Sequence, residues 1–121
     1  LTAEHAIEHA MSGFHPNLPH GAGLILISLE YYKFVADTYP DKFTRMAQAL
    51  GRADGDFIAA LADLQRQCHV DALKMSDFGM TGDDFGKYAD HAFADMGGLF
   101  RAEARPFTRD DVIGILARSY R

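Results

Sequence analysis

Three histidines lie close together near the beginning of the chain, at His5, His9 and His20. His5 and His9 are four residues apart, so they point to the same side of a helix. The segment Ser12–Pro19 contains a glycine, an asparagine and two prolines, and we expect it to form a loop that returns His20 to this side. Because neutral imidazoles that converge on one point can bind a transition metal, the pattern predicts a metal site.

The same histidines have two other interpretations. The order His-x-x-Glu-His, from His5 to His9, matches the inverted zincin signature, in which two histidines bind zinc and Glu8 is the general base. This interpretation predicts a small metal hydrolase that uses His5, Glu8 and His9. However, Glu4 and Glu8 lie about 100° around a helix from His5 and His9, which directs both carboxylates toward solvent or a neighbouring helix. The third interpretation is a helical interaction module without enzymatic activity, in which the histidines are incidental.

The composition is typical of one globular domain and argues against several classes of partner. Of the 121 residues, 48% are hydrophobic and 24% are charged, and the formal net charge is −5. No basic stripe with interleaved aromatic residues is present, so neither nucleic acid nor an anionic membrane is expected as the main partner. The longest apolar run, Ala22–Leu29, is too short to span a bilayer. The first residues do not have a signal-peptide pattern.

Cys68 is the only cysteine, so no internal disulfide can form. A reducing compartment, the cytoplasm, is the expected location. Cys68 follows the apolar spacing of its helix, which favours a buried structural thiol over a nucleophile. The chain opens with Leu1 and enters helical sequence almost at once, and we therefore expect a piece of a longer protein.

Helical periodicity covers most of the chain, and no segment is typical of a β-strand. The run Ala22–Asp37 is apolar almost all round and predicts a central buried helix. Thr38, Thr81 and Thr108 each precede an aspartate by three residues, which predicts three capped helix starts. The expected helices cover Ala3–Ser12, Ala22–Asp37, Thr38 to Leu50 before Gly51, a segment capped by Asp54 that contains Phe57 to Cys68, Thr81 to the pair Gly97-Gly98, and Thr108 to Tyr120. The predicted fold is an all-α bundle of five to seven helices, with residues 1–121 as one domain.

These features together resemble the iron-containing (group III) alcohol dehydrogenase family. The resemblance rests first on His5-x-x-x-His9, a short loop, and Pro19-His20-Gly21 at the start of a long apolar helix. It continues through the later stretches Leu73-Lys-Met-Ser-Asp-Phe-Gly-Met80, Asp83-Asp84, Pro106-Phe-Thr-Arg-Asp-Asp-Val-Ile113 and the closing Tyr120. The likeness extends over essentially the whole chain and corresponds to the C-terminal third of such an enzyme, an all-α domain of the dehydroquinate synthase-like fold.

The resemblance implies a metal site and a cofactor. Members of the family bind NAD(P) in an N-terminal α/β domain and hold Fe²⁺, or sometimes Zn²⁺, between this domain and the helical one. The metal ligands are an Asp and a His from the start of the helical domain, which this segment lacks, and two histidines that are His5 and His20 on this sequence. His9 then matches the intervening histidine, with a proton-transfer role, and Glu8 has no catalytic role. The loop before His20 is one residue longer than in the commoner family form. His15, within it, is expected first to be a surface loop residue, with approach to the substrate mouth as the alternative.

The implied activity is hydride transfer between a small alcohol and the corresponding aldehyde or ketone. The metal would act as a Lewis acid on the substrate oxygen, and the nicotinamide would carry the hydride. No dinucleotide fingerprint is present, since Gly21-Ala-Gly23 lacks the third glycine and the preceding strand. We therefore expect that the chain alone binds metal weakly, has no dehydrogenase activity and presents an exposed apolar cleft beside the histidines. A homo-oligomer is compatible with this organisation.

Overall fold

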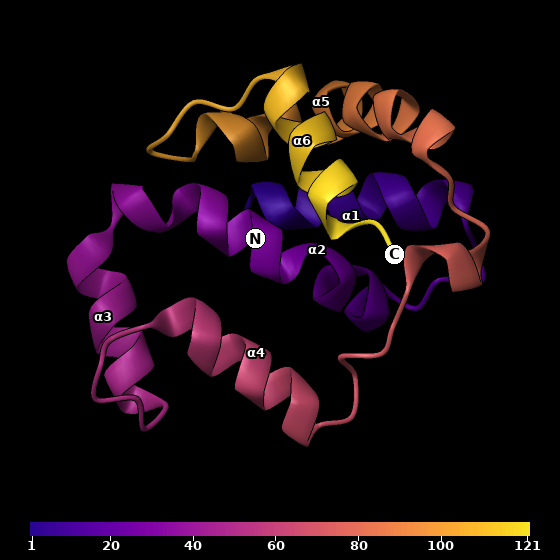
Figure 1. Ribbon diagram of the computed structural model, residues 1–121. Helices are drawn as coiled ribbons and strands as arrows, with labels where there is room; N and C mark the ends of the chain where they lie inside the picture. The colour runs from indigo at the N-terminus through magenta and orange to yellow at the C-terminus, as the bar shows by residue number, and fades with distance from the viewer.

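The computed structural model describes residues 1–121 and contains helices but no strand. Three short 3-10 helices, η1 (Ala36–Thr38), η2 (Met75–Phe78) and η3 (Gly82–Asp84), connect longer ones. The α-helices, shown in Figure 1, are α1 (Ala3–Phe14), α2 (His20–Val35), α3 (Pro40–Ala49), α4 (Phe57–Gln67), α5 (Phe85–Arg101) and α6 (Arg109–Ser119). The all-α fold expected from the sequence is confirmed, and the six α-helices fall within the predicted range of five to seven.

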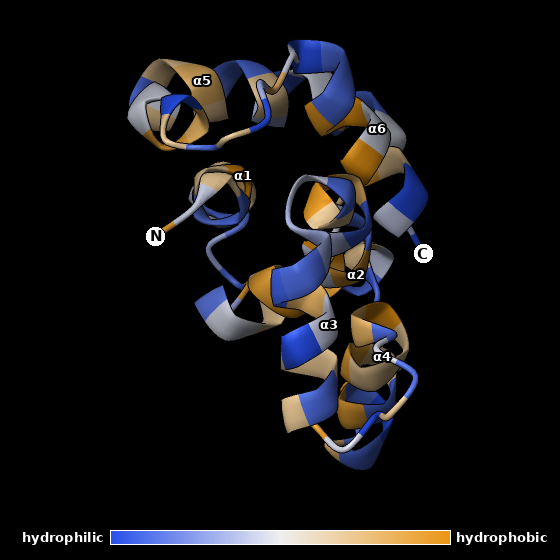
Figure 2. Cartoon of the chain, turned by 90° about the vertical axis from the view of Figure 1, so that its left-hand side faces the viewer, coloured by the Kyte–Doolittle hydropathy of each residue, from blue (hydrophilic) through white to orange (hydrophobic).

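Helix α2 lies at the centre of the bundle, as its apolar sequence predicts. It packs against α1, α4 and α6, while α1 packs mainly against α5. Figure 2 shows α2 between α1 and α6, with α3 and α4 extending away on one side. Leu26, Ile27 and Tyr31 are buried along α2. Helix α1 is therefore held from two sides, by α2 and α5, which fixes the helix that carries His5 and His9.

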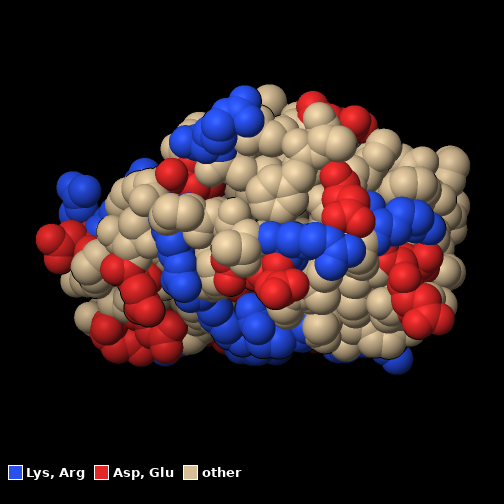
Figure 3. Space-filling view, turned by 90° about the horizontal axis from the view of Figure 1, so that it is seen from above, with Lys and Arg blue, Asp and Glu red and all other residues tan.

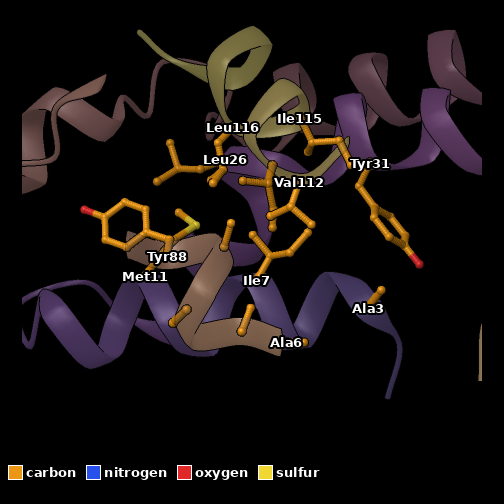
Figure 4. Packing of buried hydrophobic residues seen from close by; sticks show 14 of the residues in the cluster. Ala3, Ala6, Ile7, Met11, Leu26, Tyr31, Tyr88, Val112, Ile115 and Leu116 are labelled. Carbon is orange, nitrogen blue, oxygen red and sulfur yellow. The ribbon is translucent and has the colours of Figure 1, made fainter. Parts of the chain in front are cut away.

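The largest apolar cluster joins α1, α2, α5 and α6. Figure 4 shows Ile7, Leu26, Val112 and Leu116 gathered between the helices, with Tyr88 at one side of the group and Tyr31 at the other. All of these residues are nearly or fully buried, and burying such a side chain contributes roughly 1.5–3 kcal/mol. Because this cluster fixes the apolar face of α1, it also fixes the direction in which the polar face of α1 points.

Two of the three predicted threonine caps are confirmed. Thr81 with Asp84, and Thr108 with Asp111, form reciprocal capping boxes at the starts of η3 and α6. Thr38 does not cap α3, so this prediction is wrong. It ends the 3-10 helix Ala36–Thr38, and α3 begins at Pro40, whose fixed φ suits a first helical residue.

Helix α1 ends two residues later than predicted, α2 begins and ends two residues earlier, and two other predictions about helix ends are wrong. The N-cap of α4 is Asp56 rather than Asp54, because Asp56 accepts the Ala59 N–H at 3.0 Å. Asp54 instead accepts the N–H of Asp56 at 3.1 Å within the preceding turn. Gly97-Gly98 also does not end its helix. Helix α5 bends at Met96 and continues to Arg101, since neither glycine has the positive φ of a helix-ending residue. Phe93 and Phe100 stack across the bend with their ring centroids 4.1 Å apart.

The prediction that Cys68 is buried is wrong. Helix α4 ends at Gln67, and Cys68 occupies the cap position, where its thiol is free and exposed. Lys and Arg side chains lie beside Asp and Glu side chains on the face seen in Figure 3. Arg109 and Asp90 form one of the ion pairs of the chain. None of the helices combines the length and the apolar character that crossing a membrane requires.

Candidate metal centre

The three N-terminal histidines form one cluster. Helix α1 ends at Phe14, and the turn that follows leads through Pro19, the N-cap residue, to His20 at the first position of α2. The ring centroids of His5 and His20 are 5.9 Å apart, and those of His9 and His20 are 5.3 Å apart. The short loop therefore returns His20 to the side of α1 that carries His5 and His9, as the spacing predicts.

Glu8 belongs to the same cluster, which the sequence analysis missed. Its side chain is fully buried, and its Oε2 accepts a hydrogen bond from Nδ1 of His20, whose side chain is 52% exposed. The expectation that Glu8 faces solvent is therefore wrong, and the alternative, contact with a neighbouring helix, is confirmed. The other oxygen, Oε1, is buried without a partner. A general base must reach the proton it removes, so this buried carboxylate gives no support to a hydrolase of the inverted zincin kind.

Two sets of potential ligands can be compared in the cluster. Glu8, His9 and His20 each place one ligand atom within 4.8 Å of the others. However, Glu8 is bonded directly to Nδ1 of His20, and a metal that holds each of its ligands at about 2.0–2.2 Å has no room between these two atoms. The set that leaves Glu8 in place consists of the imidazoles alone, with Nε2 of His20 as its free nitrogen.

His5 has the properties of a neutral imidazole ligand. Its Nδ1 lies 3.4 Å from the Oγ1 of Thr2, and a proton donated there leaves the lone pair of Nε2 open to a metal. The Thr2 backbone N–H, also 3.4 Å from Nδ1, favours the opposite tautomer, and metal binding has to displace this contact. Burial lowers the pKa of His5 below its usual value, and the positive N-terminus, His20 and His9 lower it further. The neutral form, which binds metals, is therefore favoured at neutral pH. Nitrogen donors of this kind suit Fe²⁺ and Zn²⁺.

His9 is exposed beside a cavity of about 300 Å³ between α1 and α5. Both apolar and polar side chains line the cavity. The polar ones include His91 and Asp95, whose Nε2 and Oδ2 atoms are 2.8 Å apart. The other lining residues are Ala6, Ala10, Gly13, Ala92 and Met96. Part of the expected cleft beside the histidines is therefore present, although it is less apolar than predicted.

His15 is an anchor of the loop rather than a free surface residue. It caps the end of α1 through its backbone N–H, which donates to the Met11 carbonyl at 3.0 Å. Its Nε2 is hydrogen-bonded to the hydroxyl of Tyr88, which is fully buried on α5. A buried tyrosine hydroxyl usually has a partner, but the sequence alone does not indicate which residue supplies it.

Comparison with known proteins shows to which family this chain belongs. Residues 1–120 match the model of the Fe-containing alcohol dehydrogenase family, C-terminal. This chain belongs to that family. It corresponds to the helical C-terminal domain of that family, as the histidine motif implied. No curated protein sequence matches the chain.

Several solved alcohol dehydrogenases have the same helical fold. The chain is 25% identical to an archaeal halo-thermophilic alcohol dehydrogenase from a Red Sea brine pool, with a TM-score of 0.89 over 98% of this chain and 32% of that one. A 1,3-propanediol oxidoreductase, 22% identical, has a TM-score of 0.88 over 99% of this chain and 33% of its own. An iron-containing alcohol dehydrogenase from Corynebacterium glutamicum, 23% identical, has a TM-score of 0.80 over 98% and 32%. The chain thus spans about a third of the length of these enzymes.

Proposed function

We propose that this chain supplies the metal-binding side of the catalytic cleft of an NAD(P)-linked alcohol dehydrogenase. The enzyme would interconvert a small alcohol and its aldehyde or ketone by hydride transfer. The observation that carries the proposal is the approach of the His5 and His20 rings, 5.9 Å apart, from two separate helices. The match to the C-terminal family model over residues 1–120 supports it independently.

His5 and His20 would hold the metal, which is Fe²⁺ or Zn²⁺. Nε2 of each ring is open to a metal in the tautomer that carries its proton on Nδ1, which Thr2 Oγ1 accepts from His5 and Glu8 accepts from His20. Two imidazoles leave a catalytic site incomplete, since such sites use at least three protein ligands. The other ligands would be an Asp and a His from the start of the helical domain, which this segment does not include. When bound, the ion supplies Lewis acidity toward the alcohol oxygen.

His9 would move the proton of the substrate hydroxyl. Its ring stands edge-on to His20, with the two centroids 5.3 Å apart, and it is exposed beside the cavity between α1 and α5. Imidazole exchanges protons readily near neutral pH. A ring in this position can accept the hydroxyl proton from one side and release it to water on the other. His9 is therefore the catalytic residue in this proposal.

NAD or NADP would be bound mainly by an N-terminal α/β domain. The chain has no glycine-rich dinucleotide motif, and it spans about a third of the enzymes it matches. The cofactor carries the hydride, so chemistry requires both domains. We therefore expect the 121-residue chain alone to bind metal weakly and to show no turnover of alcohols.

The test uses the protein encoded by the complete reading frame that contains this sequence. Loaded with Fe²⁺ or Zn²⁺, it is expected to reduce NAD(P)⁺ with a small primary alcohol. His5→Ala and His20→Ala should each lose bound metal and activity together. His9→Ala should keep its metal but lower kcat by roughly 10²–10⁴-fold, the usual contribution of a general acid–base group. Turnover by the isolated chain, or full metal content in the His5 and His20 variants, would contradict the proposal.

A further inference from the structure

Glu8 is an unusual residue for its position. It is a carboxylate with no solvent exposure, on a helix face that packs against α2, and one of its two oxygens has no hydrogen-bond partner. Burying such a group costs stability, because the ionised form loses its hydration. Nothing in the packing of α1 requires a carboxylate here. Its single partner is Nδ1 of His20.

This contact determines where the proton of His20 resides. An ionised carboxylate can only accept hydrogen bonds, so the imidazole must carry its proton on Nδ1. In the neutral ring the other nitrogen, Nε2, then has a free lone pair. Metal-binding histidines commonly donate their second ring nitrogen to a carboxylate in this way, which fixes both the tautomer and the orientation of the ring.

Gly23 makes room for this arrangement. It lies one turn along α2 from His20 and is buried against Glu8. A Cβ at this position would lie only 2.7 Å from both Cγ and Oε1 of Glu8. Glycine inside a helix costs about 1 kcal/mol relative to alanine. The site therefore accepts two unfavourable features, a buried carboxylate and a helical glycine, and both serve the same contact.

We infer that Glu8 is a positioning residue for the metal centre, and that Gly23 provides the space it requires. Glu8 holds the proton of His20 on Nδ1 and so directs Nε2 toward the ion. The inference rests on the proposed function, because it assigns a support to one of the proposed ligands. Glu8 acts only through His20 and takes no part in proton transfer to the substrate.

Glu8→Met provides the main test, since methionine fills a similar volume without an acceptor. Its first readout is the tautomer of His20 in the metal-free chain at pH 8, measured from the ¹⁵N shifts of the two ring nitrogens. The unmodified chain should show the proton on Nδ1. Glu8→Met should return His20 to a mixture dominated by the Nε2–H form, which free histidine prefers.

The second readout is the affinity for Zn²⁺, followed in the same spectra. Loss of an outer carboxylate typically weakens metal binding 10- to 100-fold, and Glu8→Met should fall in roughly this range. Its melting temperature should be unchanged or higher, because a buried, half-satisfied carboxylate has been removed. A purely structural role would instead lower the melting temperature and leave the tautomer as it was.

Glu4→Met is the matched control. Glu4 is another buried carboxylate on α1, one turn earlier, but its Oε2 accepts from the hydroxyl of Tyr32 at 3.4 Å rather than from a histidine. The control should leave the tautomer of His20 and the Zn²⁺ affinity unchanged. Equal effects of the two substitutions would overturn the inference.

The outcomes also separate this inference from the proposed function. If His20→Ala leaves Zn²⁺ binding unchanged, the metal assignment fails. If His20→Ala abolishes binding but Glu8→Met does not weaken it, only the role of Glu8 fails. The unmodified chain gives a decision even if Glu8→Met does not fold, since a proton on Nε2 of His20 would overturn the inference by itself.

Discussion

Glu103 caps the first turn of α1, although the two lie a hundred residues apart in the sequence. Its Oε1 accepts the backbone N–H of Ala3 at 2.9 Å and the hydroxyl of Tyr31 at 2.8 Å. The carboxylate also lies at the positive end of the helix dipole, where negative charge is stabilising. Glu103 thereby ties the end of α5 to the turn of α1 that contains His5.

Glu103→Ala should destabilise the fold by about 1–2 kcal/mol, because it leaves a helix N–H and a buried tyrosine hydroxyl without their acceptor. Urea unfolding measures the loss. Glu103→Gln is the matched comparison: it keeps an acceptor oxygen and should lose less than half as much. Equal stability of the alanine variant and the unmodified chain would show that the contact contributes nothing.

The fold class could be predicted from the sequence because its signals are local. The apolar run of α2 and the capping boxes at Thr81 and Thr108 each involve residues a few positions apart, and the structure confirms them. A local signal misled the prediction at Gly97-Gly98, because neither glycine adopts the positive φ that ends many helices. Helix α5 bends at Met96 instead and continues to Arg101, with Phe93 and Phe100 stacked across the bend.

The candidate site was predictable only in part, because only some of its contacts follow from local sequence signals. The i, i+4 spacing and the Pro-rich loop place His5, His9 and His20 together. The bond between Glu8 and His20 was not foreseen, because it depends on how closely α1 and α2 approach. Gly23 was the signal that could have indicated it, since a glycine in an otherwise apolar helix often marks a close contact.

The packing of Gly23 against Glu8 gives a second stability prediction. Gly23→Ala should cost about 1–3 kcal/mol, because the new Cβ would lie 2.7 Å from the Glu8 side chain. In a Glu8→Ala background the same substitution should be neutral or stabilising, since the space is then free and alanine favours helix. A double-mutant cycle by urea unfolding measures this coupling. Additive effects of the two substitutions would contradict the close contact.

The bond between His15 and Tyr88 should hold the loop before His20. Tyr88→Phe removes only the hydroxyl, so we expect a loss of about 1 kcal/mol in unfolding free energy. Hydrogen exchange at the Leu18 amide, which donates to the His15 carbonyl at 2.9 Å, should become faster. Tyr120→Phe is the control, because it also removes one tyrosine hydroxyl. The Tyr120 side chain is partly exposed, and its hydroxyl donates to the Met80 carbonyl at 3.4 Å, away from the loop. Unchanged exchange at Leu18 in Tyr88→Phe would remove the anchoring role.

Glu4 should make stability fall as the pH rises. Burial raises its pKa from 4.5 to about 7, the hydrogen bond from Tyr32 partly offsets this, and the charge of Glu103 raises it further. The folded state therefore binds the proton more tightly than the unfolded state, and the contribution of Glu4 is fully present below about pH 4.5 and lost as the pH passes 7. Glu4→Gln should consequently be more stable than the unmodified chain at pH 8, by up to about 3 kcal/mol. Urea titrations at pH 4 and pH 8 measure the difference, and an advantage of equal size at both pH values would contradict the assignment.

In this account His5 and His20 hold a divalent metal, and Glu8 accepts a hydrogen bond from Nδ1 of His20, the ring nitrogen that does not bind the ion. Anomalous diffraction at the zinc absorption edge, from crystals of the Zn²⁺-loaded protein, tests it most directly. The expected result is one peak bonded to Nε2 of both His5 and His20, with Glu8 still bonded to Nδ1 of His20. A peak bonded to Glu8, or no peak beside His20, would contradict it.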